Sequence, residues 1–431
     1  ALPGFVWVGV SRADILLDMK DKDLYAQILG ITYPWTVREV GLQLQGGEVI
    51  IHLELAPGYA LTCPLCGKAA PGYDTRRRRW RHLDTCQYRT VLVADVPRVE
   101  CEEHGVHQVN IPWSESGSRF TALFEALAIN WMKAASLTAV HRLLGISWDE
   151  AAGIQERAVI RGLERREAIV PKRISVDETS FQKRHEYVTV VSNQNTGKVL
   201  YVADDRGQTS LDDFYLALNE TQLSGIESVC MDMWPPYISS TQKHVPDAEK
   251  KIAFDKFHVA KHLGDAVDKV RRSEHKQLLD QGCYDLKGTR YLWLRKEENL
   301  SPQRWEDLNV LRNRALKTAK AWAVKEMVMS LWVYKTRGWA RKAWEQSLHW
   351  AKQTGLGPVV SVAETLERHL QGILNAIVLR ATNGMAEGIN SRIQWIKKMA
   401  CGFRNRERFR RAILFHLGGL DLYPAAAVKQ S

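Results

Sequence analysis

RISVDETSFQKRHEYVTVVSNQNTGKVLYVAD, residues 173–204, is the stretch that decides the fold. Three β-like runs, RISVDETSF, EYVTVVSN and KVLYVADD, follow one another with short turns such as Gln194-Asn195-Thr196-Gly197. Runs rich in β-branched and aromatic residues, bounded by turn residues, are typical of strands. The pattern predicts a three-stranded meander.

Helices and strands alternate after this meander. The helical run LDDFYLALNE precedes a strand, ESVCMDMW, which is followed by another helix and a further strand, KIAFDKFHV. This order describes a ribonuclease H-like α/β layer. In that arrangement the first and fourth strands are neighbours, so Asp177 and Asp232 are expected to lie together.

Three acidic residues carry the functional hypothesis. Asp177 lies in the first strand, Asp232 ends the fourth, and Glu387 lies in the first turns of a helix that follows Thr382. That helix has an apolar stripe, formed by Ile389, Ile393, Ile396 and Ala400. Glu387 is on the opposite, polar side. Carboxylates at strand ends and on a neighbouring helix can hold two divalent cations, which favour in-line displacement at phosphorus.

Residues near the predicted acids have weaker assignments. Asp255 and His258 follow a strand end and are candidates for a shell around the metals or the scissile phosphate; the alternative is a satisfied structural pair. Trp234 could stack on a displaced base, although core packing is the interpretation we favour. Alternation along the strand sends Glu178 to the other face, where a structural role is expected.

Two half-sites with metal-ligand spacing precede the meander. Cys63-Pro-Leu-Cys66 and Cys101-Glu-Glu-His104 predict one structural Zn²⁺ held by three thiolates and an imidazole. Cys86 and His107 are alternative ligands, each more simply explained as an ordinary residue. A segment of this size is expected to have little core of its own, so that the metal would hold it folded.

Basic residues gather where a nucleic-acid backbone could lie. The chain has 60 Lys and Arg against 49 Asp and Glu, a net charge of +11, which suits a polyanionic partner. Candidate contacts in the zinc segment are Arg76, Arg77, Arg78, Arg79 and Arg81. Candidates after Glu387 are Lys397, Lys398, Arg404, Arg406 and Arg408, with Arg410 and Arg411 extending the same path.

A helix-turn-helix is predicted between the zinc segment and the meander. Leu137, Val140, His141 and Leu144 fall on one helical face, and after Gly145 a second helix can start with Ser147 as its cap and Glu150 three residues on. This second helix would present Gln155, Arg157 and Arg161 to DNA. Two packed helices with no DNA-reading role are the alternative.

The remaining organisation follows from composition. The stretch from Asp265 to Glu364 loses β character and holds seven of the fifteen tryptophans, which predicts an all-helical insertion whose tryptophans mostly pack internally. The expected domains are an N-terminal segment with a β-hairpin (1–57), a zinc-binding module (58–115), a helix-turn-helix (116–170), a first core part (171–265), the insertion (266–365), a second core part (366–420) and a tail (421–431). The fold class is therefore multidomain α+β.

Targeting signals and disulfides are not expected. The opening run ALPGFVWVGV lacks a basic flank and soon meets Arg12 and Asp14, so it is neither a signal peptide nor a membrane span. Seven unevenly spread cysteines argue against a disulfide framework. A soluble intracellular protein is expected, with 45% apolar residues, an ordinary share for a globular chain.

Several motifs together resemble the bacterial insertion-sequence transposases of the ISL-three family. They are WRHLDTCQYRTVLVADVPRVECEEHGVHQVNIPW, SRFT, ISVDETSF, MDMWPPY, FDKFHVAKH and TNGMAEGINSRIQWIKKMACGFRNRERFRRAIL. The similarity runs from about Val37 to Leu417. It implies a catalytic DDE triad at Asp177, Asp232 and Glu387, and a zinc finger at the four ligands named above.

The resemblance also implies an activity and its partners. Two Mg²⁺ (or Mn²⁺) ions would be held by the triad, and the enzyme would cleave double-stranded DNA at transposon ends and join the 3′-hydroxyl to target DNA. Pairing of two ends implies a homodimer in the bacterial cytoplasm, associated with the nucleoid, with no membrane partner. The alternatives are a catalytically silent DNA-binding regulator and a nuclease that cuts without joining.

Overall fold

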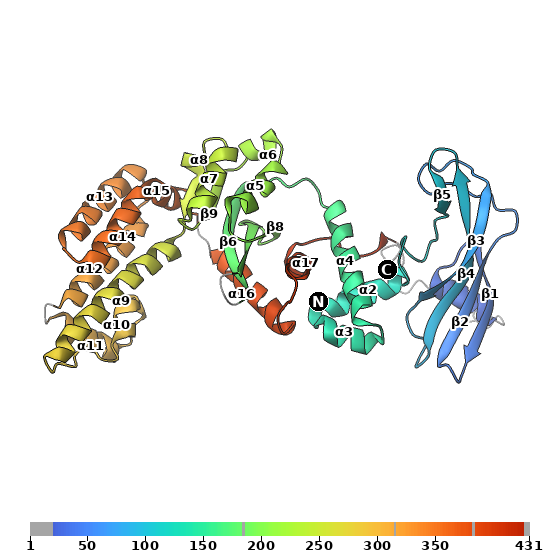
Figure 1. The fold of residues 1–431 in the computed structure, drawn as a ribbon, viewed down its shortest axis with the longest axis horizontal. Helices are drawn as coiled ribbons and strands as arrows, with labels where there is room; N and C mark the ends of the chain where they lie inside the picture. Colours follow the sequence, from blue (N-terminus) through green and yellow to red (C-terminus); the bar gives the residue numbers. More distant parts are fainter. Residues whose placement is uncertain (1–19, 183–185, 314–315, 382–383, 426–431) are drawn as a thin grey trace, which may run out of the picture. The chain divides into compact units, whose positions relative to one another are not determined.

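A computed structural model describes residues 20–182, 186–313, 316–381 and 384–425. Two compact units make up the chain (Figure 1): one extends to Arg165 and includes the residues from Asp421 on, and the other runs from Arg166 to Leu420. The expectations for the opening run ALPGFVWVGV lie outside the described residues. Within the described ranges, no helix is long and apolar enough to cross a membrane.

A five-stranded sheet forms the first part of the first unit. Its elements are α1 (Asp21–Leu29), β1 (Trp35–Gln43), β2 (Glu48–Leu55), β3 (Gly72–Arg81), β4 (Arg89–Cys101) and β5 (Gly105–Gln108). The strand order is β1-β2-β4-β3, with β5 also paired to β4. β1 and β2 are antiparallel, which confirms the predicted hairpin, whereas β2 and β4 are parallel.

The core of this sheet includes residues of both the zinc segment, expected to have little core of its own, and the N-terminal hairpin. Trp35 lies 4.9 Å from Trp113 and Trp80 lies 5.4 Å from it, both edge to face between ring centroids. Ile51 and Leu92 are fully buried in the same cluster. The zinc segment therefore shares a hydrophobic core with the N-terminal hairpin, because the β2–β4 pairing joins strands that are distant in sequence.

Three helices complete the first unit: α2 (Ala122–Ala134), α3 (Leu137–Leu144) and α4 (Trp148–Glu164). Gly145, with a φ of 62°, ends α3 in the left-handed conformation that glycine adopts without strain. Ser147 and Glu150 form the predicted capping box at the start of α4. The helices and their turn thus occur where the sequence predicts them.

The second unit is built on another five-stranded sheet, in the order β10-β9-β6-β7-β8. The strands are β6 (Arg173–Gln182), β7 (Glu186–Asn193), β8 (Val199–Asp204), β9 (Ser228–Met231) and β10 (Ile252–Phe254). β6, β7 and β8 form the predicted antiparallel meander. β9 is parallel to β6, so the first and fourth strands are neighbours, as predicted.

Helices cover both faces of this sheet (Figure 1). α16 (Gly384–Met399) and α17 (Arg406–Leu417) pack on one face, where Ile389, Ile393 and Ile396 meet Val188 and Val190. α5 (Gln208–Leu216) and α7 (Pro235–His244) contribute to the core on the other face, with α6 (Glu220–Ser224) and α8 (Ala248–Lys251) beside them. Ile389, Ile393 and Ile396 of the predicted stripe are therefore buried, whereas Ala400 is half-buried and follows the end of α16. The predicted polar side is divided, because Asn390 and Gln394 contact β6 whereas Glu387 is exposed.

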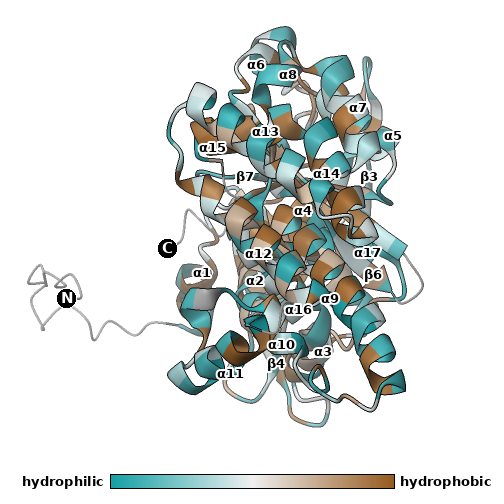
Figure 2. Ribbon diagram, turned by 90° about the vertical axis from the view of Figure 1, so that its left-hand side faces the viewer, coloured by the Kyte–Doolittle hydropathy of each residue, from teal (hydrophilic) through white to brown (hydrophobic). Residues whose placement is uncertain are grey.

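A helical region separates β10 from α16. Its helices are α9 (Lys256–Asp280), α10 (Arg290–Leu294), α11 (Pro302–Arg312), α12 (Lys317–Ser330), α13 (Arg337–Gln353), α14 (Gly357–Arg368) and α15 (Leu370–Leu379), with short 3-10 turns at Glu297–Asn299 and Leu331–Val333. Apolar and polar residues alternate around α9, α12 and α14 (Figure 2). Trp293, Trp322 and Trp344 are buried, so internal packing accounts for them.

Candidate active site and zinc site

The zinc site is assembled from the two predicted half-sites. The ligand atoms of Cys63, Cys66, Cys101 and His104 all lie within 4.8 Å of one another. Cys66 Sγ is 3.8 Å from Cys101 Sγ, and His104 Nδ1 is 3.5 Å from Cys101 Sγ. These separations suit a tetrahedral ion with Zn–S bonds of about 2.3 Å. Three thiolates and one imidazole are a structural zinc donor set.

Local backbone geometry forms each half-site. The Cys63 N–H donates to the Lys68 carbonyl and the Gly67 N–H to the Cys63 carbonyl, which closes the first loop. Cys101 ends β4, and its pairing with Gly105 turns the chain so that His104 faces it. Backbone hydrogen bonding from Cys66 is the main cause that lowers the Cys63 pKa to about 6, which favours the thiolate. Neither Cys86 nor His107 belongs to the ligand group.

Asp177 lies in β6, and Asp232 directly follows β9, the strand that pairs in parallel with β6. This pairing ends at Ser175 and Cys230, two residues before each acid. The charge of Asp232 contributes to the raised pKa of Asp177, so the two carboxylates lie near each other. The Asp177 carboxylate accepts from the Glu178 N–H and from the Asn390 side chain, both at 2.8 Å. Asp232 accepts from the Trp234 N–H at 3.0 Å.

Burial sets the electrostatics of these two acids. It raises the Asp177 pKa to about 6, with Asp232 and Glu178 adding to the rise and His258 opposing it. Burial also raises the Asp232 pKa, against the influence of His258 and Arg206. Among the residues that the structure describes, neither carboxylate forms an ion pair with Lys or Arg. Two adjacent acids without a balancing cation fit a divalent metal, whose charge would offset both.

Glu387 is exposed on the first turn of α16. It precedes Asn390 by three residues and therefore lies on the same helical face, one turn from the contact with Asp177. The three carboxylates do not form a group as tight as the zinc ligands in the described chain. The structure thus brings Asp177 and Asp232 near each other but does not bring Glu387 into one metal-binding group with them among the described residues.

The residues predicted to lie around the two aspartates differ in their contacts. Asp255 is buried at the start of α9, and His258, one turn later, lies close enough to lower the pKa of both aspartates. Trp234 is half-buried: its indole N–H donates to the Arg206 carbonyl at 2.9 Å, and the Arg206 guanidinium lies 4.6 Å from its ring. Glu178 forms an ion pair with Arg206 at 3.3 Å. This contact agrees with the structural role expected for Glu178 on the face of the strand opposite to Asp177.

Two residues near the acids were missed by sequence reasoning. Asn390 contacts Asp177, and its position three residues after Glu387 was the available signal. Arg206 lies between the rings of Tyr187 and Trp234, 4.7 Å and 4.6 Å from their centroids. Nothing in the local sequence indicates that role, because β7, β8 and α7 must first be folded together.

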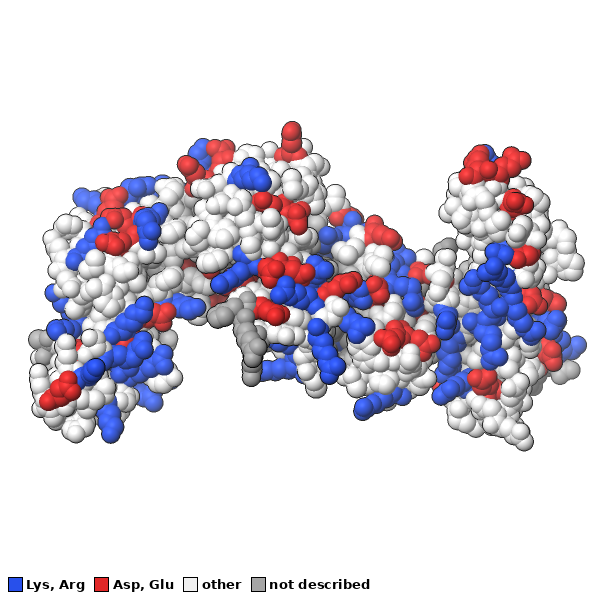
Figure 3. Space-filling model, in the orientation of Figure 1, with Lys and Arg blue, Asp and Glu red and all other residues white. Residues whose placement is uncertain are grey.

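The predicted DNA-contact arginines of β3 differ in exposure. Arg76, Arg77 and Arg79 are exposed, and Arg78 is half-buried. Lys and Arg side chains gather over β3 and β4 (Figure 3). Arg81, however, pairs with Asp84 and lies 5.3 Å from the Phe124 ring, so it is held within the unit. Trp80, which interrupts the run, is buried in the core.

The basic residues after Glu387 also divide into two sets. Lys398, Arg404 and Arg408 are exposed. Lys397 donates to the Ser180 carbonyl at 2.9 Å, and Arg406 pairs with Asp205 at 3.0 Å and with Glu186 at 3.5 Å. Lys397 and Arg406 are therefore engaged within the unit.

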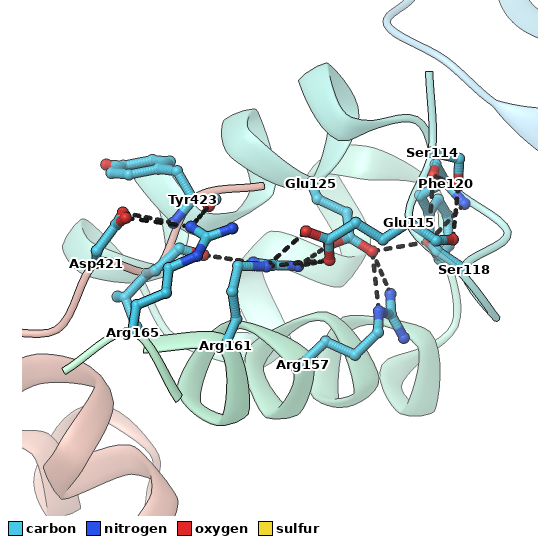
Figure 4. A network of polar contacts seen from close by, with 11 residues as sticks. Ser114, Glu115, Ser118, Phe120, Glu125, Arg157, Arg161, Arg165, Asp421 and Tyr423 are labelled. Carbon is cyan, nitrogen blue, oxygen red and sulfur yellow. Dashed lines mark hydrogen bonds and ion pairs between the residues drawn. The ribbon is translucent and has the colours of Figure 1, made fainter. Parts of the chain in front are cut away.

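The residues predicted to read DNA from α4 are corrected by the structure. Gln155 and Arg161 are only 6% and 5% exposed. Arg161 donates to Glu115 at 2.9 Å and to Glu125 at 3.0 Å, and Arg157 donates to Glu125 at 3.0 Å (Figure 4). The two arginines neutralise acids of their own unit, of which Glu125 is buried and Glu115 is half-buried. The pattern of α4 was correct, but its basic side faces inward.

Comparisons with known proteins cover most of the chain. Residues 174–413 match the family model of the ISL3 DDE transposases, described as a transposase, and residues 60–104 match the zinc finger of the transposases of IS204, IS1001, IS1096 and IS1165. The transposase of IS1001 from Bordetella parapertussis is 27% identical over 81% of this chain and 87% of its own length. The transposase of IS1557 from Mycobacterium tuberculosis is 24% identical over 93% and 96%.

Proposed function

Because this chain belongs to the ISL3 family of DDE transposases, we propose that it binds the terminal inverted repeats of an insertion sequence, cleaves the DNA strand there and joins the 3′-hydroxyl end to target DNA. The observation that carries this proposal is a pair of half-buried aspartates, one in β6 and one directly after the neighbouring strand β9, with Asn390 of α16 in contact with Asp177. Asp177, Asp232 and Glu387 are the proposed catalytic residues.

The three carboxylates would hold two divalent cations, Mg²⁺ or Mn²⁺. Bound there, the cations supply activation of the attacking oxygen and stabilisation of the leaving oxygen. The protein's own part is to hold one acid in a strand, one directly after the neighbouring strand and one on a helix packed against the sheet. His258 lies near both aspartates and is proposed to steady their charge.

Both proposed steps exchange one phosphorus–oxygen bond for another. In cleavage, water attacks the phosphorus at the transposon end, the bond to the 3′ oxygen breaks, and a 3′-hydroxyl is released. In joining, the oxygen of this hydroxyl forms a bond to the phosphorus of a target phosphodiester, and the bond from that phosphorus to the target 3′ oxygen breaks. The attacking hydroxyl loses a proton and the departing oxygen takes one up, so that it leaves as a 3′-hydroxyl. Neither step needs a covalent bond to the protein.

The strand order of the second unit supports a ribonuclease H-like core, because its meander and parallel neighbours place acids as that fold does. For the first unit we propose DNA binding through the zinc-stabilised sheet, with Arg76, Arg77 and Arg79 on phosphates. The domain ranges given above remain proposals, and so does the pairing of two transposon ends by a homodimer.

The test uses full-length variants on duplex DNA that carries a transposon end. Asp177→Asn, Asp232→Asn and Glu387→Gln should each reduce Mg²⁺-dependent cleavage at least about 1,000-fold, because each removes a negatively charged metal ligand. Asp307→Asn is the matched control on exposed α11 and should keep wild-type activity. Wild-type cleavage by Asp177→Asn would exclude this active site.

The same preparation separates the alternatives. A silent regulator would bind end DNA without any metal-dependent product. A nuclease would cleave but give no joined product when a target and a preformed 3′-hydroxyl end are supplied. We expect both products from the wild-type chain, since all three acids are present.

A further inference from the structure

The contact between Asn390 and Asp177 joins α16, which carries Glu387, to β6. The Asn390 amide donates to Asp177 Oδ2 at 2.8 Å, across 213 residues of sequence. The Glu178 N–H holds the other oxygen, Oδ1, at the same distance. Each carboxylate oxygen has two lone pairs, so each keeps one for a further ligand. The carboxylate is thus fixed in orientation and still able to bind a cation.

This contact belongs to a series that sets the register of α16 along β6. Gln394 donates to Thr179 Oγ1 at 3.0 Å and Lys397 donates to the Ser180 carbonyl at 2.9 Å. Four helical residues advance about 6 Å, and two strand residues advance about 7 Å. The two advances are similar, so α16 runs alongside β6 and successive helical residues contact successive strand residues. Asn390 makes the contact of this series that lies nearest to Glu387.

The chemistry of an amide suits this position. A Lys or Arg in place of Asn390 would pair with Asp177 and supply the positive charge that a metal otherwise provides. An amide donates a hydrogen bond while leaving the carboxylate charge in place. The apolar residues beside it, Ile389 and Ile393, are buried against the sheet and hold the amide at its distance.

We propose that Asn390 is a positioning residue of the active site, which orients Asp177 for divalent-cation binding and fixes the register that carries Glu387. This inference rests on the proposed function, because it assigns Asp177 to the metal. Residues that orient a metal ligand typically change metal affinity or activity about 10- to 100-fold when they are replaced.

The experiment measures Mn²⁺ binding to the full chain by electron paramagnetic resonance, alongside strand cleavage. Asn390→Leu and the smaller Asn390→Ala should each weaken Mn²⁺ binding about 10- to 100-fold and lower cleavage similarly at limiting metal. Excess Mn²⁺ should restore much of the cleavage. Gln394→Leu removes the neighbouring contact to Thr179 without touching a carboxylate, and should change Mn²⁺ affinity less than about threefold.

Three results separate the outcomes. If both Asn390 variants bind Mn²⁺ as Gln394→Leu does, the positioning role is wrong, whatever their cleavage rates. If Asp177→Asn binds and cleaves as the wild type does, the proposed active site itself is wrong. Weakened binding in both Asn390 variants, with folding unchanged by thermal denaturation and Asp177→Asn inactive, supports both inferences.

Discussion

At the scale of single residues, charge and donor chemistry decide what each site can hold. Thiolates and an imidazole converge at Cys63, Cys66, Cys101 and His104, with no carboxylate among them. Half-buried carboxylates without a Lys or Arg ion pair, by contrast, lie in β6 and directly after β9, within the described part of the chain. Soft ligands favour zinc and hard oxygen ligands favour Mg²⁺ or Mn²⁺. The zinc donor set and the carboxylate pair are therefore chemically distinct.

Zinc content tests the first of these sites. Cys63→Ser should lower bound zinc from one ion per chain to near zero, because an alcohol is a poor substitute for a thiolate in a four-ligand site. Cys86→Ser is the matched control, since Cys86 is exposed and outside the ligand group. Zinc is measured by atomic absorption on purified protein. Equal zinc in the two variants would contradict the assigned ligands.

At the scale of elements, polar contacts join the sheet and helices of the first unit. His82 follows β3 and is buried, and its Nδ1 lies 2.8 Å from the hydroxyl of Thr121. Thr121 caps α2, accepting from the Phe124 N–H at 3.3 Å. The neutral imidazole accepts from this hydroxyl, so the ring connects the start of α2 to the sheet.

This contact predicts a pH dependence of stability. Burial lowers the His82 pKa from 6.5 to about 4, with Arg81 adding to the effect. The unfolded chain then binds more protons between these values, so the contribution is complete above pH 6.5 and is lost as the pH falls toward 4. The full difference between the two pKa values corresponds to about 3 kcal/mol of unfolding free energy.

Denaturant unfolding of wild type and His82→Gln, measured from pH 7 to pH 4, checks this prediction. Glutamine cannot take up a proton in this range, so the variant should lose less stability on acidification, even if it starts less stable at pH 7. The quantity of interest is the difference between the two proteins at each pH. A constant difference would show that His82 is not the buried titrating group.

At the scale of the whole molecule, residues that follow the second unit in sequence complete the first unit. Leu422 is 1% exposed, and its carbonyl accepts from Arg161. Arg165 pairs with Asp421 at 3.1 Å and donates to the Tyr423 carbonyl at 2.6 Å, while Lys133 lies 4.6 Å from the Tyr423 ring (Figure 4 shows the Arg165 contacts). The chain thus leaves and re-enters this unit at adjacent residues.

Truncation tests this completion. Ending the chain after Leu420 should lower the unfolding free energy of the first unit by roughly 2–5 kcal/mol, because it uncovers a buried leucine site and removes an acceptor from buried Arg161. Ending it after Ala425 keeps the contacts and is the matched control. Unfolding of the first unit is followed by hydrogen exchange. Equal protection of α4 in both truncations would rule out the stabilising role.

Local pattern was enough for a large part of this protein. The spacing of Cys63, Cys66, Cys101 and His104, the capping box of Ser147 and Glu150, the meander and the apolar stripe of α16 all depend on residues close in sequence. Periodicity and spacing are local properties, and the sequence carries them directly. The family motifs, spread over most of the chain, were recognisable for the same reason.

Tertiary structure decided which distant residues each helix or strand contacts. The parallel β2–β4 pairing gave the zinc segment its core, Glu115 and Glu125 drew Arg161 inward, and the docking of α16 set Asn390 on Asp177. A helix pattern shows that a polar side exists, but its partner comes from elements far along the chain. Burial and pairing depend on such distant partners, because a charge is stable inside a protein only where another group arrives to balance it.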